Sequence, residues 1–255
     1  MESAYDKRPT QKDYLEDTYK FELTATVLDI KPDEKDEKTF RVLLDKTIFH
    51  PQGGGQPSDE GSISTSSSKF IVSDLIFDRE TELLWHKGKF EDSQFAVGET
   101  VNLKINEEKR KLNARLHSAG HIIDIAVARL GLKWEPGKGY HFPNGAYVEY
   151  AGTIPADKPD LKIELQAIVE QVIKETSEED SAKVQVWKYE EAGKYIEVPS
   201  YLPAGKPIRF VKLSGEDKGC PCGGTHVKHL KEIGKLSVEK IQKKGKNLRV
   251  SYSLA

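Results

Sequence analysis

Two short segments, far apart in the chain, contain most of the side chains that could bind a metal ion. His117 and His121 are four residues apart in RLHSAGHIID, residues 115–124. Cys222 and His226 repeat this spacing in CPCGGTH, residues 220–226, whose glycines are typical of a tight loop. The apolar residues around the first pair predict a helix, on which side chains four residues apart project from one face. The two pairs therefore predict one site, formed by a helix and a distant loop.

Three imidazoles and one thiolate form a ligand set that suits zinc. A single HxxxH pair is more often a surface or core pair. The chain has two cysteines and seven histidines, however, and four of these residues lie in the two pairs, which favours a metal site. We predict one zinc ion per chain, bound by His117, His121 and Cys222, with His226 as the fourth ligand or directly beside the metal. A zinc protease would need Glu after the first His, where this chain has Ser118.

Length and composition are those of a globular protein. A chain of 255 residues can form one large or two modest cores, and we expect two domains, at residues 1–104 and 105–255. Hydrophobic residues make up 37% and charged residues 31%, without an apolar run long enough to cross a membrane. Residues 1–8 lack the apolar core of a signal peptide, and two cysteines fit a reducing compartment. We therefore expect a cytoplasmic protein.

Hydrophobic patterning predicts an α+β fold, with a small N-terminal β-barrel followed by a mixed α+β domain. Runs of alternating apolar residues predict barrel strands at 19–30, 39–45, 70–79, 83–87 and 100–105, with a Ser/Thr-rich hairpin tip at 62–68. Helical spacing predicts helices at 106–130 and 160–175. The second domain is completed by a hairpin turn at 143–145, an acidic turn at 178–180, strands at 183–189 and 208–213, and a closing hairpin of 233–241 with 248–254.

Basic residues are concentrated beside the two metal-binding motifs. The net charge of −2 argues against binding of nucleic acid by bulk charge, but residues 104–115 and 228–249 are rich in Lys and Arg. Such runs are often ordinary solvated faces, and the alternative is contact with RNA. The residues that we expect to contact RNA are Lys109, Arg110, Arg115, Lys243 and Lys244.

A glycine-rich segment, FHPQGGGQPSDEG at residues 49–61, lies in the predicted barrel. It is no Walker loop, because neither Lys-Ser nor Lys-Thr follows the glycines. Two interpretations remain open, a tight structural loop or a loop that borders the active site. Gln56 is the residue in it that we would test first.

HSAGH, CGGTHV and this glycine-rich segment together resemble the editing domain of alanyl-tRNA synthetases and its free-standing AlaX-type relatives, over residues 14–252. The editing domain of threonyl-tRNA synthetases shares the metal-binding pattern. The resemblance implies a zinc-dependent trans-editing hydrolase that cleaves the ester between a wrong amino acid and alanine-specific tRNA. The substrate would be seryl-tRNA, with glycyl-tRNA left open. It also implies a monomeric protein whose partner is aminoacylated tRNA, without membrane or DNA.

The resemblance implies that His117 and His121 act in catalysis through zinc, which would either activate water or orient the substrate. The residues that we expect to bind the substrate are Ser118, Thr225, Gln56 and Gly139. Synthetase editing domains often have a water-orienting Gln before a Lys-Gly pair, where this chain has Gly137.

Four further points stay open at this stage. Cys220 could be a bystander, an alternative ligand or an oxidation liability. We interpret His86 as a structural or surface residue rather than a ligand, and His141 as a core or rim residue, with lining of the pocket as the alternative. The alternatives for function are a non-catalytic, zinc-stabilised tRNA-binding module and editing of threonine-specific tRNA.

Overall fold

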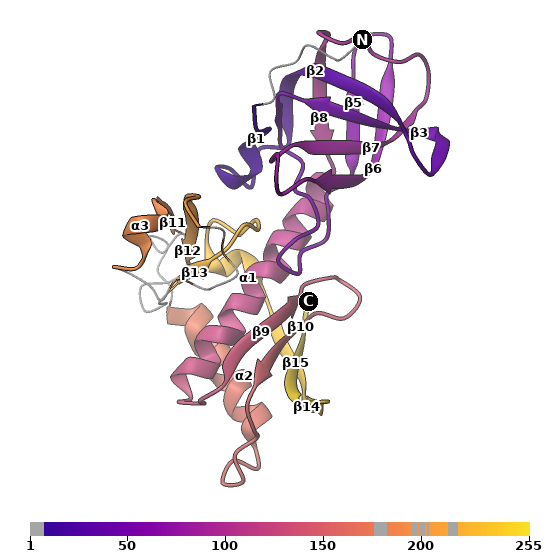
Figure 1. Ribbon diagram of the computed structural model, residues 1–255. Coiled ribbons are helices and arrows are strands. Elements are labelled where there is room, and N and C mark those ends of the chain that lie inside the picture. Colours follow the sequence, from indigo (N-terminus) through magenta and orange to yellow (C-terminus); the bar gives the residue numbers. More distant parts are fainter. Residues whose placement is uncertain (1–7, 176–182, 195–197, 199–201, 203, 214–218) are drawn as a thin grey trace. The chain divides into compact units, whose positions relative to one another are not determined.

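The computed structural model describes residues 8–175, 183–194, 198, 202, 204–213 and 219–255 (Figure 1). The predicted acidic turn at 178–180 and the first seven residues lie outside this part of the chain. The chain packs as two compact units, Met1–Asn113 and Ala114–Ala255, which divide within helix α1 (Glu107–Arg129). The expected domain boundary after residue 104 stays a prediction. No helix in the described ranges is long and apolar enough to cross a membrane.

The first unit is built on a closed six-stranded barrel, which confirms the predicted α+β class with its N-terminal barrel (Figure 1). Closure pairs every strand on both sides and leaves no exposed sheet edge. Around the barrel the strands are β2 (Glu22–Asp33), β3 (Asp36–Leu44), β7 (Leu84–Phe90), β6 (Lys69–Phe77), β5 (Gly61–Ser64) and β8 (Thr100–Ile105). Before and beside them lie β1 (Gln11–Lys12), a 3-10 turn (Asp13–Leu15) and β4 (Lys46–Thr47).

Two details of the barrel differ from or refine the sequence prediction. The Ser/Thr-rich segment at 62–68 is only partly a hairpin tip, because Ile63 is fully buried and its neighbours pair in β5. His86 is structural, as expected, since its Nε2 lies 2.8 Å from Thr47 Oγ1 and its Nδ1 lies 3.2 Å from Val42 O. Burial lowers the pKa of His86 to about 4, so the ring is neutral.

The glycine-rich segment forms a tight turn. Gly54 and Gly55 have φ values of 56° and 80°, and the flanking Gly53 and Gln56 exchange backbone hydrogen bonds of 3.2 and 2.9 Å. Two consecutive positive φ angles are the geometry of a two-residue hairpin turn, which glycine adopts without strain. Gln56 is fully buried in the first unit, and its role in substrate binding stays a prediction.

A buried ion pair fixes the same segment to the start of helix α1. Arg110 and Asp59 are 0% and 1% exposed at their side chains, and Arg110 Nη2 contacts Asp59 Oδ2 closely. The guanidinium also donates to the carbonyl oxygens of Thr18 and Ile48, and Asp59 Oδ2 accepts a 2.7 Å bond from His50 N. The expected contact of Arg110 with RNA is therefore wrong, because burial and these partners occupy its donors.

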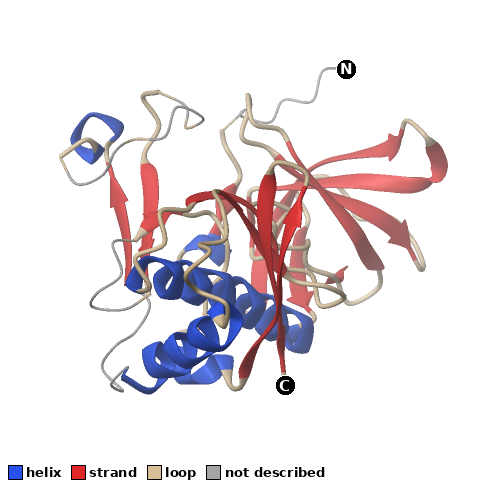
Figure 2. Cartoon of the chain, turned by 90° about the horizontal axis from the view of Figure 1, so that it is seen from below, coloured by secondary structure: helices blue, strands red, loops and turns tan. Residues whose placement is uncertain are grey.

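The second unit joins two helices to a four-stranded antiparallel sheet (Figure 2). Its sheet runs in the order β14 (Leu236–Lys244), β15 (Asn247–Leu254), β10 (Tyr147–Ala151), β9 (Glu135–Tyr140). The second helix is α2 (Leu161–Glu175), and a smaller sheet consists of β11 (Lys183–Trp187), β12 (Ile208–Lys212) and β13 (Cys220–Pro221). Two short helices, α3 (Tyr189–Ala192) and a 3-10 turn (Leu230–Ile233), were not predicted.

Local signals explain where these elements begin and how they pack. Asn106 caps α1, since its Oδ1 accepts a 3.0 Å bond from Lys109 N. The inner face of the sheet meets α1 through two tyrosines: Tyr150 donates to Asp124 Oδ1 at 2.5 Å and Tyr252 to Leu116 O at 2.9 Å. The predicted helices and the closing hairpin thus form one layered core, in which the buried face of the sheet covers the helix that carries HSAGH.

The Arg110–Asp59 pair gives a stability prediction. Asp59→Asn would leave the buried guanidinium without its counter-charge, and we expect a loss of about 3–5 kcal/mol in unfolding free energy. Glu60→Gln is the matched control, because Glu60 pairs with Lys109 on the surface and such pairs contribute at most about 1 kcal/mol. Urea unfolding followed by circular dichroism measures both. Equal losses in the two variants would contradict the role of the buried pair.

Candidate metal centre

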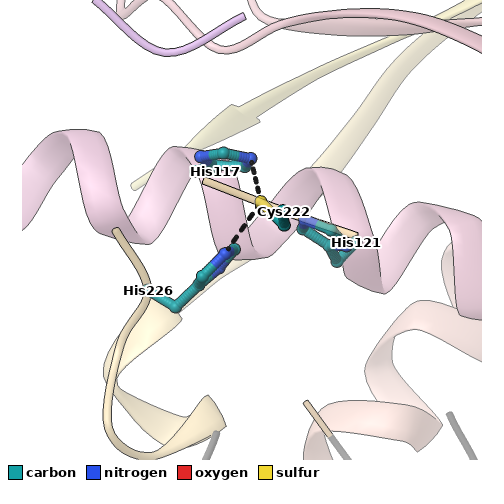
Figure 3. A group of neighbouring side chains, drawn as sticks. All are labelled: His117, His121, Cys222 and His226. Atoms are coloured by element: carbon teal, nitrogen blue, oxygen red, sulfur yellow. Dashed lines mark hydrogen bonds between the residues drawn. The ribbon is translucent and has the colours of Figure 1, made fainter. Parts of the chain in front are cut away.

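The four side chains predicted to bind metal come together in the second unit. One ligand atom from each of His117, His121, Cys222 and His226 lies within 4.8 Å of all the others (Figure 3). Cys222 Sγ is 3.5 Å from His117 Nε2 and 3.3 Å from His226 Nε2. Around a tetrahedral zinc, with bonds of about 2.0–2.3 Å, sulfur and nitrogen would be about 3.5 Å apart. The cluster therefore has the donors and the size to hold a metal ion.

The helix and the loop contribute differently to this cluster. His117 and His121 are one turn apart on α1, and their rings stack at a centroid distance of 5.3 Å. His117 and His226 are buried, whereas His121 and Cys222 are half-buried. The cluster is thus anchored in the core on one side and accessible on the other, as a site for a substrate requires.

Arg209 on β12 shapes the loop that carries Cys222. Its Nη1 donates to the carbonyl oxygens of Cys222 and Gly224 at 2.7 and 3.1 Å, and its own carbonyl accepts from Cys222 N at 3.1 Å. Burial raises the pKa of the Cys222 thiol, while the Gly224 N–H at 3.4 Å and the Arg209 charge act in the opposite direction. A cation in the cluster would supply the remaining stabilisation of the thiolate.

Ser118 contacts the cluster through His226. The Ser118 Oγ lies 3.2 Å from His226 Nδ1 and accepts a 3.1 Å hydrogen bond from Val227 N. Because His226 Nε2 faces Cys222, a metal-binding His226 would carry its proton on Nδ1 and donate it to Ser118. The sequence suggested substrate binding for Ser118, but its contacts fit a role in orienting His226.

His141 is the neighbour of the cluster that sequence reasoning underestimated. Its ring stacks on His117 at a centroid distance of 4.6 Å and an angle of 18°. Its Nδ1 lies 2.6 Å from the Tyr252 hydroxyl, which itself donates to Leu116 O, so Nδ1 carries the proton. Burial, and secondly the charge of His121, lower the pKa of His141 to about 3. The only sequence signal was its place shortly before the predicted hairpin turn at 143–145.

Three glycines make room around this histidine and its strand. A Cβ at Gly120 would lie 2.5 Å from His141 Cε1, and one at Gly139 would lie 2.5 Å from His141 Nε2. Gly139 thus supports the position of His141, and its predicted contact with substrate stays a prediction. At Gly137, a Cβ would lie 3.1 Å from Glu149 O, so a glutamine would need a local shift of the backbone. The close approach of Glu149 O thus accompanies the glycine that this chain has in place of the glutamine of synthetase editing domains.

The remaining candidate residues are placed as follows. Cys220 Sγ lies 3.5 Å from His121 Nδ1, beside the cluster, whose sulfur comes from Cys222. Thr225 is fully buried in the loop. The Arg115 guanidinium donates to Ile233 O at 3.2 and 2.9 Å, while Lys243 and Lys244 are exposed. RNA contact by these residues stays a prediction.

Two known protein families match parts of this chain, and one match includes the loop of the cluster. The family described as tRNA synthetases class II (A) matches residues 3–109. The family described as threonyl and alanyl tRNA synthetase second additional domain matches residues 208–249, which include the loop of the cluster. Both matches thus relate parts of this chain to domains of tRNA synthetases.

Individual relatives define the family more closely. Alanyl-tRNA editing protein AlaX-M of Pyrococcus horikoshii is 31% identical over 231 residues, which are 89% of this chain and 89% of the relative. AlaX-L of the same organism is 30% identical over 94% of this chain, but the match spans only 57% of AlaX-L. Alanine–tRNA ligase of Methanoregula boonei is 30% identical over 92% of this chain and 24% of the ligase. The chain belongs to the AlaX family of alanyl-tRNA editing proteins, which confirms the resemblance seen in HSAGH and CGGTHV.

The contact between Ser118 and His226 can be tested with zinc as the probe ion. Ser118→Ala removes the acceptor of the His226 Nδ1 proton, and we expect the affinity for Zn²⁺ to fall by about 10- to 100-fold. Competition with a chromophoric chelator measures this affinity. Ser118→Thr, which keeps a hydroxyl, should bind more like the wild type. An unchanged zinc affinity in Ser118→Ala, with the metal-free melting temperature also unchanged, would refute the orienting role.

Proposed function

We propose that this protein hydrolyses the ester bond of alanine-specific tRNA that carries the wrong amino acid, with serine as the preferred substrate. The observation that carries this proposal is the His117/His121/Cys222/His226 cluster in a chain of the alanyl-tRNA editing family. The two relatives in that family are named as alanyl-tRNA editing proteins. Water adds to the ester carbonyl carbon, the bond to the ribose oxygen breaks, and that oxygen leaves with a proton.

We propose zinc as the ion of the cluster, because imidazole and thiolate donors at tetrahedral spacing suit it best. When bound, zinc would polarise the ester carbonyl or lower the pKa of a water molecule. The protein contributes the orientation of the donors: α1 sets His117 and His121, Arg209 holds the Cys222 loop, and Ser118 holds His226. Three of these ligands would leave a position for substrate, whereas four would complete the tetrahedron.

Discrimination against alanine needs a polar group that pairs with the serine hydroxyl. A site built to bind a hydroxyl leaves its own polar atoms unpaired when the substrate lacks it, which penalises alanine. Thr225 is our candidate, since it lies between the two cluster residues Cys222 and His226 in the loop and is fully buried. This arrangement would spare correctly charged tRNA.

The main test is deacylation of purified seryl-tRNA for alanine. The wild type should release serine and leave alanyl-tRNA intact. His121→Ala removes a ligand donor, and we expect its rate to be at least about 100-fold lower, since even residues that only support metal ligands contribute 10- to 100-fold. Seryl-tRNA for threonine is the control for the alternative activity. Fast release from the threonine tRNA alone would assign the protein to that substrate instead.

Chelation separates catalysis from a purely structural metal. If zinc serves catalysis, a chelator should abolish deacylation while circular dichroism and the melting curve show a folded protein. Unfolding on chelation, with no deacylation in the untreated protein, would instead support a zinc-stabilised tRNA-binding module.

The selectivity hypothesis has its own measurement. Thr225→Val keeps the volume of the side chain and removes its hydroxyl, so we expect the ratio of seryl- to alanyl-tRNA deacylation to fall by about 10-fold or more. Thr225→Ser, which keeps the hydroxyl, should retain most of the ratio. An unchanged ratio in Thr225→Val would exclude Thr225 from the recognition of serine.

A further inference from the structure

The sheet of the second unit has a second face, turned away from its buried side. Strand register identifies the side chains of this outer face. They alternate along the strands with side chains that are buried, namely Val148, Tyr150, Leu248, Val250 and Tyr252. One row across this outer face reads Tyr140, Tyr147, Ser251, Lys240. The next row reads Glu149, Arg249, Gln242, and a further one reads Glu135, Ala151, Asn247, Lys244.

Aromatic rings form a continuous pile on this outer face. Phe142 and Tyr140 stack at a centroid distance of 4.4 Å and an angle of 14°, and Tyr140 stacks on Tyr147 at 5.1 Å and 15°. The Arg249 guanidinium covers Tyr147, with its Cζ 3.7 Å from the ring centroid. All four side chains are half-buried, so Phe142 forms an accessible end of the pile.

Acidic and basic side chains share the outer face, and the basic ones lie on the β14–β15 hairpin. Residues 240–255 carry no acidic side chain, and their basic ones are Lys240, Lys243, Lys244, Lys246 and Arg249. Glu239, directly before them, accepts a hydrogen bond from Ser253 Oγ. Glu149, which faces this hairpin, pairs with Arg249 at 2.8 Å. In the described part of the chain, Lys240 and Lys244 have no ion-pair partner. Stacked rings beside unpaired lysines are the combination with which proteins bind single-stranded RNA.

The position of the pile relates it to the metal centre. Tyr140 and Phe142 flank His141, and the ring of His141 stacks on His117 of the cluster. One short segment therefore contributes to both the outer face and the centre. A nucleotide held at Phe142 would lie next to the segment that lines the cluster.

We propose that this outer face binds the unpaired 3′ end of the tRNA substrate. A nucleobase extends the aromatic pile at Phe142, and Lys240 and Lys244 contact phosphates. An unpaired end is the part of a tRNA that offers free base faces, and it also carries the ester that must reach the cluster. The identity of the RNA rests on the proposed function, whereas the binding of unpaired RNA does not.

The test measures the binding of two fluorescent RNA hairpins that copy the tRNA acceptor stem, with and without the unpaired 3′ nucleotides. We expect the wild type to prefer the hairpin with the unpaired end. Phe142→Leu should weaken binding of that hairpin by about 10-fold and leave the blunt hairpin unaffected, since a lost stack costs roughly 5- to 150-fold. Its zinc content should match the wild type.

The lysines are tested by a matched pair of double variants. Lys240→Gln with Lys244→Gln should weaken RNA binding and flatten its salt dependence by about 1–2 in log–log slope. Lys162→Gln with Lys174→Gln makes the same charge change at exposed positions of α2 and should bind like the wild type. If both pairs behave alike, the positive charge of the outer face has no specific role.

Two outcomes separate this proposal from the proposed function. The proposed RNA face would be refuted if the wild type bound both hairpins equally. It would also be refuted if Phe142→Leu lowered the melting temperature without weakening RNA binding, even in a protein that deacylates seryl-tRNA. A preference for the unpaired end that depends on Phe142, in a protein that deacylates neither tRNA, would support the face and reject the enzymatic function. With both intact, Phe142→Leu should raise the KM of deacylation by a similar factor.

Discussion

Helical periodicity is the constraint on which the candidate site depends. Because side chains four residues apart project from one face of α1, His117 and His121 are held on a single rigid element. The distant loop has only to bring Cys222 and His226 to that face. The loop is fixed there by Arg209 and by Ser118, which accepts from Val227 N and contacts His226. The candidate metal centre thus has one half that the helix holds rigid and another half that hydrogen bonds position.

Neighbouring residues at and just after the end of β9 face different parts of the second unit. His141 points toward the cluster and its neighbours Tyr140 and Phe142 stack on the outer face, because successive side chains of an extended chain point to opposite sides. Such alternation brings the candidate metal centre and the proposed RNA-binding face close together. A substitution at Tyr140 or Phe142 could therefore also disturb His141 beside the cluster, which is why zinc content serves as the control.

Prediction from sequence succeeded where a residue's role follows from local spacing. The barrel strands, the helix at 106–130 and the four cluster residues follow from periods of two and four residues and from the rarity of Cys and His in the chain. It failed for Arg110, because the sequence shows a basic residue in a basic run but not the buried carboxylate of Asp59 that pairs with it. It also underestimated His141, whose partners His117 and Tyr252 are distant in sequence.

Residue types at short, fixed spacings were enough to predict the donor set, the fold class and the family. The tertiary structure decided which polar side chains face the cluster, which basic residues are buried and which aromatic rings stack across strands. Ser118 and His226 are far apart in the chain, as are Tyr147 and Arg249, and their contacts arise only when loop, helix and strand register are in place. Such contacts depend on packing between distant segments, which no local pattern encodes.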